Sequence, residues 1–182
     1  MSAAESTRHV VVMGVSGSGK TTIAQGISAV TGMPYGEADQ FHPQANVDKM
    51  AAGIPLNDED RWPWLRDIAA WMASEAADGK STVVACSALK RSYRDLLRGG
   101  PPALQFVQLD GSAEVIRERM SHRSGHFMPT TLLDSQIATL EPLQPDEDGI
   151  VLDLTLPPEV LVDEAVRLLH LPVRQAENPS KG

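Results

Sequence analysis

The stretch Gly14-Val15-Ser16-Gly17-Ser18-Gly19-Lys20-Thr21 matches the phosphate-loop pattern G-x-x-x-x-G-K-[ST] at every fixed position. It stands between an apolar run at 10–13, which predicts a buried strand, and a segment at 20–31 with helical spacing of apolar residues. Glycines allow close backbone approach to a phosphate, and the backbone N–H groups form an anion cradle with the helix N-terminus. The alternative is an ordinary glycine turn, but pattern and context together favour a nucleoside triphosphate site.

The residue types in this loop predict ATP and Mg²⁺ as cofactors. Lys20 is expected to reach the β- and γ-phosphates, and the Thr21 hydroxyl is expected to bind Mg²⁺. The predicted nucleotide contacts are Gly14, Ser16, Gly17, Ser18, Gly19, Lys20, Thr21 and Thr22.

Apolar runs and helical segments alternate along the rest of the chain. Further strands are predicted at 33–36, 82–86, 104–109 and 150–154, and further helices at 43–53, 61–77, 88–97, 112–122, 130–140 and 158–169. Such alternation is typical of βαβ units and a parallel sheet. The length of 182 residues suits a single α/β domain, 1–182, with loose polar ends at 1–7 and 174–182.

Composition excludes several classes of function. The formal net charge of -8 argues against a nucleic-acid partner, because such a partner calls for a basic face. The only cysteine is Cys86, so no intrachain disulfide can form, which fits a cytoplasmic location. No apolar run approaches the roughly 20 residues of a membrane span, so no membrane association is expected.

A basic cluster at 117–127 is the candidate for a lid over the nucleotide. Arg119 and Arg123 are four residues apart and therefore share a helix face. Arginine near the γ-phosphate stabilises the charge of the phosphoryl group in transfer. The alternative is a solvated helix end whose basic residues complement the helix dipole. No guanine-reading Asn-Lys-x-Asp motif occurs, so a small kinase is favoured over a GTPase.

Two carboxylates follow the second predicted strand, where an acceptor site is expected. Glu37 and Asp39 are two apart and point the same way in an extended chain. One could hold a metal-bound water while the other accepts the proton of an attacking hydroxyl; alternatively both are surface carboxylates. The strand at 82–86 is followed by Ser87 rather than by an aspartate, so Mg²⁺ must rely on Thr21, phosphates, waters and Glu37.

Several longer stretches make the chain resemble the gluconate kinase family, in register over residues 9 to about 155. They are Met13–Lys20, Asp39–Pro43, Asn46–Met50, Gly53–Arg61, Cys86–Asp95, Gly125–Phe127 and Ser135-Gln136. Their combination is far more specific than the phosphate loop alone. One departure is Glu37, which stands where relatives often carry aspartate.

The resemblance implies transfer of the ATP γ-phosphate to the 6-hydroxyl of D-gluconate, giving 6-phosphogluconate. It implies a P-loop NTPase fold like those of shikimate and nucleoside monophosphate kinases: a five-stranded parallel sheet sandwiched by helices, with a helical substrate-binding insertion at about 40–80 and a lid at about 119–129. It also implies a homodimer. The stretch 142–146 is a candidate for the adenine pocket.

The resemblance also assigns roles to individual side chains. Asp39 orients or deprotonates the acceptor hydroxyl, and Arg119 and Arg123 are lid arginines. The implied substrate contacts are Asp39, His42, Lys49, Arg61, Ser87 and His126. Two alternatives remain: a kinase for another small hydroxy acid such as shikimate, and a nucleotide-binding module without turnover.

Overall fold

The protein, a computed structural model that describes residues 7–121 and 130–174, is built around one parallel sheet. The strands are β1 (His9–Met13), β2 (Tyr35–Glu37), β3 (Thr82–Ala85), β4 (Leu104–Asp110) and β5 (Gly149–Asp153). Their order is β2-β3-β1-β4-β5, and every neighbouring pair is parallel. The predicted five-stranded parallel sheet is therefore confirmed, and β1 lies at its centre.

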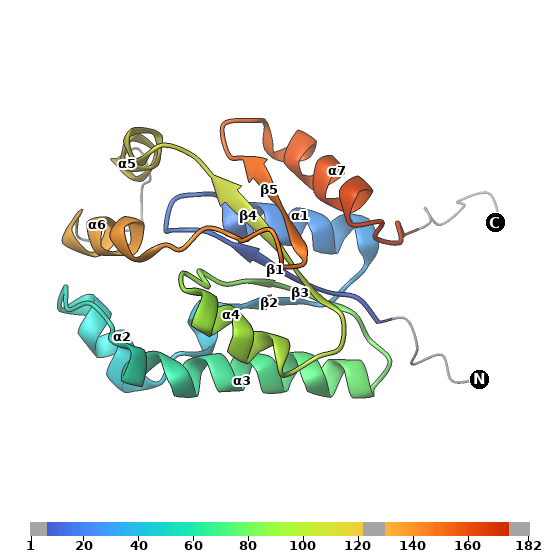
Figure 1. Ribbon diagram of the computed structural model, residues 1–182, viewed down its shortest axis with the longest axis horizontal. Helices are drawn as coiled ribbons and strands as arrows, with labels where there is room; N and C mark the ends of the chain where they lie inside the picture. The colour runs from blue at the N-terminus through green and yellow to red at the C-terminus, as the bar shows by residue number, and fades with distance from the viewer. Residues whose placement is uncertain (1–6, 122–129, 175–182) are drawn as a thin grey trace, which may run out of the picture.

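Helices cover both faces of this sheet (Figure 1). The helices are α1 (Lys20–Thr31), η2 (Ala38–Phe41, a 3₁₀ helix), α2 (Gln44–Ala51), α3 (Asp58–Ala77), α4 (Arg91–Arg98), α5 (Ala113–Ser121), α6 (Thr130–Thr139) and α7 (Pro158–Leu168). The pair α1 and α7 packs on one face, and the pair α3 and α4 on the other. In Figure 1, α2, α5 and α6 gather at the carboxyl ends of the strands, whereas β1 starts and α7 ends at the opposite edge.

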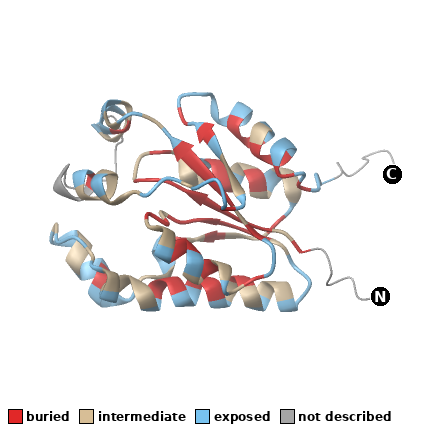
Figure 2. Ribbon diagram, in the orientation of Figure 1, coloured by how far each residue is buried: buried red, intermediate tan, exposed pale blue. Residues whose placement is uncertain are grey.

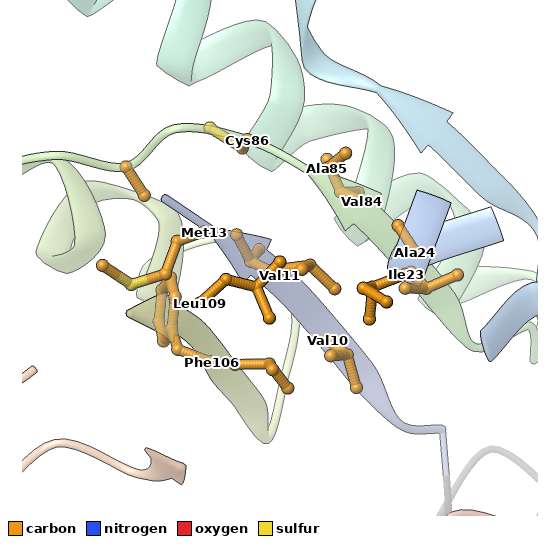
Figure 3. Packing of buried hydrophobic residues seen from close by; sticks show 14 of the residues in the cluster. Val10, Val11, Met13, Ile23, Ala24, Val84, Ala85, Cys86, Phe106 and Leu109 are labelled. Atoms are coloured by element: carbon orange, nitrogen blue, oxygen red, sulfur yellow. The ribbon is translucent and has the colours of Figure 1, made fainter. Parts of the chain in front are cut away.

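The core explains why the strands are continuous apolar runs. All five residues of β1 are buried, because α1 covers one side of the strand and the sheet faces helices on the other (Figure 2). Figure 3 shows Val10, Val11 and Met13 of β1 beside Ile23 of α1 and Phe106 of β4. This packing holds the loop after β1 at the sheet's carboxyl edge.

Two helix starts differ by three residues from the boundaries predicted from the sequence. The helix predicted at 88–97 begins only at Arg91, because Ala88 has a left-handed φ of 44° that a helix cannot contain. Helix α3 begins at Asp58 rather than at 61. There Asn57 and Asp60 form a reciprocal capping box, with the Asp60 N–H donating to Asn57 Oδ1 at 2.9 Å.

The described chain ends are held by the fold. Thr7 is buried, and the Arg174 N–H donates to the Val30 carbonyl at 2.7 Å; the rest of the ends predicted to be loose lies outside the described residues. Within 7–121 and 130–174, none of the helices has the length and apolarity that a membrane crossing needs.

His9 makes stability depend on pH. The ring is fully buried, its Nδ1 lies 2.7 Å from Thr82 Oγ1, and its Nε2 has no hydrogen-bond partner in the described structure. Burial lowers the pKa of His9 below its ordinary value of 6.5. The unfolded chain therefore binds this proton more readily, so stability is complete above about pH 6.5 and falls as the pH drops below it.

We expect His9→Val to weaken this pH dependence. Urea unfolding at pH 7.5 and at pH 5.5 gives the loss of unfolding free energy over that interval for each protein. The loss should be smaller in His9→Val than in the wild type. Equal losses in the two proteins would mean that His9 is not the titrating group.

Candidate active site

The phosphate loop connects β1 to α1 and has the backbone that its glycines predict. Gly14, Gly17 and Gly19 have φ values of 153°, 83° and 95°. A Cβ on Gly14 would lie 2.6 Å from Ser18 Oγ, and one on Gly17 would lie 2.7 Å from Met120 Cγ. Glycine is therefore required at both positions. The Ser18 side chain is itself buried, which leaves the loop's backbone to line the surface that a phosphate would meet.

Oxygen atoms suited to Mg²⁺ meet at the start of α1. The Thr21 hydroxyl donates to Glu37 Oε2 at 2.8 Å, and the Tyr35 hydroxyl donates to the same carboxylate oxygen. Hydroxyl and carboxylate oxygens are the hard donors that Mg²⁺ takes, usually one or two from protein with phosphates and water completing the shell. Among the described residues, no group of three or more His, Cys, Asp or Glu side chains is arranged so that it could hold a metal ion.

A cavity of about 290 Å³ opens beside the phosphate loop. Four of the six predicted acceptor contacts line it, together with two residues of the phosphate loop: Asp39, His42, Arg61 and Ser87, and Ser16 and Lys20. These residues come from four separate segments of the chain and meet at the sheet's carboxyl edge, where ligands gather in open α/β sheets. The structure thus places a candidate base, a phosphate-loop lysine and an arginine on one cavity.

His42 is held as a neutral ring. It stacks on Trp64, with ring centroids 4.2 Å apart and planes 14° apart, and its Nδ1 lies 3.2 Å from Asn46 Nδ2. Burial lowers the pKa of His42 to about 4; Asp39 opposes the shift and Arg61 adds to it. At neutral pH the imidazole can exchange hydrogen bonds with hydroxyl groups but offers no positive charge.

The two cations predicted to meet the substrate are placed differently. Lys49 Nζ pairs with the Asp60 carboxylate at 2.8 Å, and Lys49 is not among the cavity-lining residues. Arg61 lines the cavity, and its Nη1 donates to the Tyr93 hydroxyl at 2.8 Å. The geometry therefore favours Arg61 over Lys49 as the group that meets an acid.

The predicted lid is described only in part. Arg119 lies at the end of α5, where its Nη2 donates to the Leu154 carbonyl at 2.6 Å. Its Nη1 would lie 4.0 Å from a Cβ placed on Gly19, so the guanidinium is beside the phosphate loop. Arg123 and His126 lie outside the described residues. Thr22 is exposed in the first turn of α1.

The segment after β3 contacts both the phosphate loop and the cavity beside it. The Ser87 carbonyl accepts a hydrogen bond from the Gly14 N–H at 3.3 Å, and Ser87 also lines the cavity. Cys86 is fully buried, and burial raises the pKa of its thiol to about 12. The thiol stays protonated at neutral pH, as expected for a small apolar side chain rather than a nucleophile.

Gln136 of α6 was not among the predicted site residues. Its Oε1 accepts the Ser16 N–H at 2.8 Å, and Gln136 lines the cavity beside Ser135. The pair Ser135-Gln136 carries no chemistry by its spacing alone, and only the family resemblance pointed to it. A glutamine that contacts the phosphate loop from 120 residues away is not visible as a pattern in the sequence.

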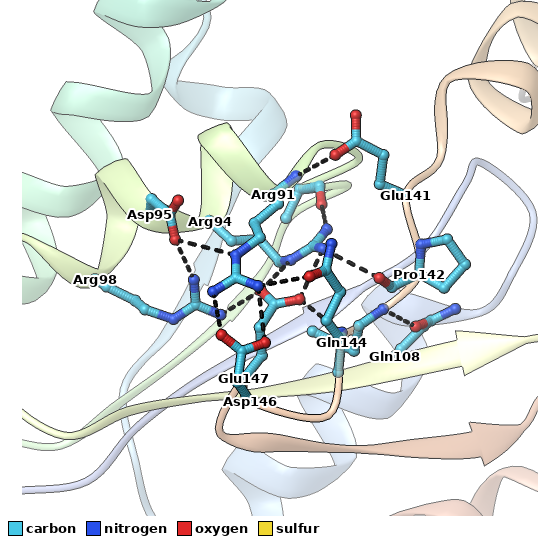
Figure 4. A network of polar contacts seen from close by, with 12 residues as sticks. Arg91, Arg94, Asp95, Arg98, Gln108, Glu141, Pro142, Gln144, Asp146 and Glu147 are labelled. Atoms are coloured by element: carbon cyan, nitrogen blue, oxygen red, sulfur yellow. Dashed lines mark hydrogen bonds and ion pairs between the residues drawn. The ribbon is translucent and has the colours of Figure 1, made fainter.

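The candidate adenine stretch has polar partners on α4. Gln144 Oε1 accepts from Arg91 Nη1 at 2.7 Å, and the Asp146 carboxylate pairs with Arg91 Nη2 at 2.6 Å (Figure 4). The Leu143 N–H donates to Gln108 Oε1 at 2.8 Å. These contacts attach residues 142–146 to α4 and β4. They account for the polar residues of this stretch by structural contacts within the protein.

Comparisons with known proteins agree with this geometry. The family model described as shikimate kinase matches residues 16–165. The gluconokinase of Gluconobacter oxydans (strain 621H) is 46% identical over 160 residues, which is 88% of this chain and 90% of that protein.

Solved structures are similar over almost the whole chain. A sugar kinase from Janibacter sp. HTCC2649 has a TM-score of 0.88 and 62% identity, covering 91% of this chain and 96% of its own. A gluconokinase from Sinorhizobium meliloti 1021 has a TM-score of 0.82 and 48% identity, and the match covers 89% of this chain and 91% of that protein's chain. Together with the phosphate loop and the cavity beside it, these matches show that the chain belongs to the gluconokinase family of P-loop kinases.

Proposed function

We propose that this protein is an ATP-dependent gluconokinase, which transfers the γ-phosphate of ATP to the 6-hydroxyl of D-gluconate and forms 6-phosphogluconate and ADP. One observation carries the proposal: Lys20 of the phosphate loop, the Asp39 carboxylate and the Arg61 guanidinium line the same cavity. A phosphate-binding cation, a proton acceptor and a second cation are what transfer to a hydroxylated acid requires.

Each group acts on one part of the acceptor. Asp39 orients the 6-hydroxyl and accepts its proton, because its exposed carboxylate lines the cavity next to the phosphate loop. Arg61 binds the gluconate carboxylate at the other end of the acid. His42, held neutral, exchanges hydrogen bonds with hydroxyl groups between them, and Ser87 does the same.

The phosphate loop and its neighbours would bind the nucleotide and its metal. The backbone N–H groups of 14–19 and Lys20 hold the triphosphate, and Thr21 and Glu37 hold Mg²⁺ directly or through water. When bound, MgATP supplies the phosphoryl group and neutralises part of its charge. Arg119 and Arg123 are proposed to stabilise the phosphoryl charge; the position of Arg119 beside Gly19 supports its part.

The remaining expectations belong to the same proposal. The chain acts as a single kinase domain with a substrate-binding region at about 40–80, and it works as a cytoplasmic homodimer without nucleic-acid or membrane partners. The negative net charge and the single buried cysteine support the location and the absence of a nucleic-acid partner. The resemblance to gluconate kinases supports the dimer.

An acceptor panel tests the proposal. Purified protein with MgATP is assayed for ADP release with gluconate, shikimate and several other sugar acids, and the product is identified as a 6-phosphate by mass and NMR. We expect turnover that depends on gluconate. Turnover with shikimate alone would refute the proposal that gluconate is the phosphoryl acceptor. ATP binding without turnover on any acceptor would favour a non-catalytic nucleotide-binding module.

A further inference from the structure

The Arg61 guanidinium is positioned by a phenol rather than by a carboxylate. Its Nη1 donates to the Tyr93 hydroxyl at 2.8 Å, and its Cζ lies 5.4 Å from the centroid of the Tyr93 ring. Among the described residues, no carboxylate forms an ion pair with Arg61, although Asp58 and Asp60 lie on the same helix, α3. The Arg61 guanidinium is thus held in place without a direct ion pair to a carboxylate of the described residues.

The Tyr93 hydroxyl is itself oriented by Asp58. It donates to Asp58 Oδ1 at 2.5 Å, and the same oxygen accepts from Lys90 Nζ at 2.9 Å. A tyrosine hydroxyl has a single proton. Because that proton points at Asp58, the phenolic oxygen must present a lone pair to Arg61. The chain of contacts therefore runs in one direction, from Arg61 through Tyr93 to Asp58.

The Tyr93 side chain is held in place by its burial and packing. It is 1% exposed, is not among the cavity-lining residues, and packs edge-on against Trp62 with ring centroids 5.6 Å apart. Burial raises the pKa of Tyr93, and the bond to Asp58 raises it further. The phenol therefore remains a donor throughout the range in which the protein would work.

We propose that Tyr93 is a positioning residue for acid recognition: it orients Arg61 toward the carboxylate of the acceptor and keeps Asp58 from pairing with it. This inference rests on the proposed function, because it assigns the acceptor carboxylate to Arg61. A direct Asp58–Arg61 pair would have to be broken by each incoming acid. With Tyr93 between the two groups, an acid meets an oriented cation at no such cost.

Tyr93→Phe tests the inference, because it keeps the ring and removes the hydroxyl. We expect the KM for gluconate to rise about tenfold to a hundredfold, the range for losing one hydrogen bond to a charged group, while the KM for ATP and the thermal midpoint change little. A merely structural role would move all three quantities together. Asp58→Asn, at a partly exposed site, should also raise the gluconate KM, but by less than Tyr93→Phe.

A double-mutant cycle with Arg61→Ala then tests whether Tyr93 acts through Arg61. In the Arg61→Ala background, Tyr93→Phe should cause no further loss of gluconate binding, measured by calorimetry with the nucleotide-loaded protein. An unchanged gluconate KM in Tyr93→Phe would overturn the inference. So would losses of gluconate binding that add fully in the double variant. In either case, gluconate turnover by the wild type would leave the proposed function standing. Absence of turnover in the wild type would overturn both.

Discussion

Asp39→Asn is expected to lower kcat with gluconate by about 10²- to 10⁴-fold, the usual contribution of a positioned general base. The amide has nearly the shape of the carboxylate but cannot take the proton of the attacking hydroxyl. Asp39 is an exposed residue of η2 on the cavity wall, so the change leaves the core untouched. ADP release with saturating gluconate measures the effect, and the thermal midpoint should stay near that of the wild type.

Lys20→Ala is the matched variant, because it affects the nucleotide rather than the acceptor. It removes the cation of the phosphate loop, so turnover and ATP binding should fall together. Asp39→Asn should retain ATP affinity, as measured by calorimetry. Wild-type kcat in Asp39→Asn would exclude Asp39 as the base, and loss of ATP binding in that variant would place it in the nucleotide site instead.

Arg94→Met is expected to destabilise the fold by about 3–5 kcal/mol, the cost of breaking a buried ion pair from one side. Arg94 is fully buried, and its Nε and Nη2 donate to the Glu147 carboxylate at 2.8 and 3.0 Å (Figure 4). Burial alone would raise the pKa of Glu147, but hydrogen bonds from Arg94, Arg98 and the Gln144 N–H bring it down to about 2. Without Arg94, the buried Glu147 carboxylate loses two of its hydrogen bonds and keeps those from Arg98 and the Gln144 N–H.

Two controls separate this effect from a general loss of charge. The double variant Arg94→Met/Glu147→Leu removes both charges and should recover much of the lost stability, because a buried ion pair is often replaceable by apolar groups. Arg167→Ala removes an exposed pair with Glu164 and should cost no more than about 1 kcal/mol. Urea unfolding of the four proteins gives the values. If Arg94→Met were as mild as Arg167→Ala, the buried Arg94–Glu147 pair would not be a stabilising unit.

The fold was largely predictable because its signals are local. A continuous apolar run, a glycine-rich loop and a helix follow one another at 10–31, and strands and helices alternate after them. The structure confirms the resulting parallel sheet. The start of α4 was not predictable, because Ala88 adopts a left-handed conformation that an alanine does not signal in the sequence; its carbonyl accepts from Arg94 Nη1 at 2.9 Å.

The site was predictable in its residue types but not in its pairings. The family resemblance gave both Lys49 and Arg61 as substrate contacts. The structure separates them, because Lys49 reaches Asp60 across the α2–α3 turn while Arg61 meets Tyr93 from α4. Tyr93 and Gln136 carried no functional signal of their own. Their contacts span 32 and 120 residues, and no short pattern records them.

The separation of the two sheet edges has a practical consequence. The candidate site lies at the carboxyl edge, whereas β1 starts and α7 ends at the other edge (Figure 1). A purification tag or a fluorescent reporter joined directly to residue 7 or residue 174 would therefore be attached at the edge opposite the reacting groups. Immobilisation through such a tag would leave the cavity open to the medium, which suits the protein to use in a surface-bound sensor.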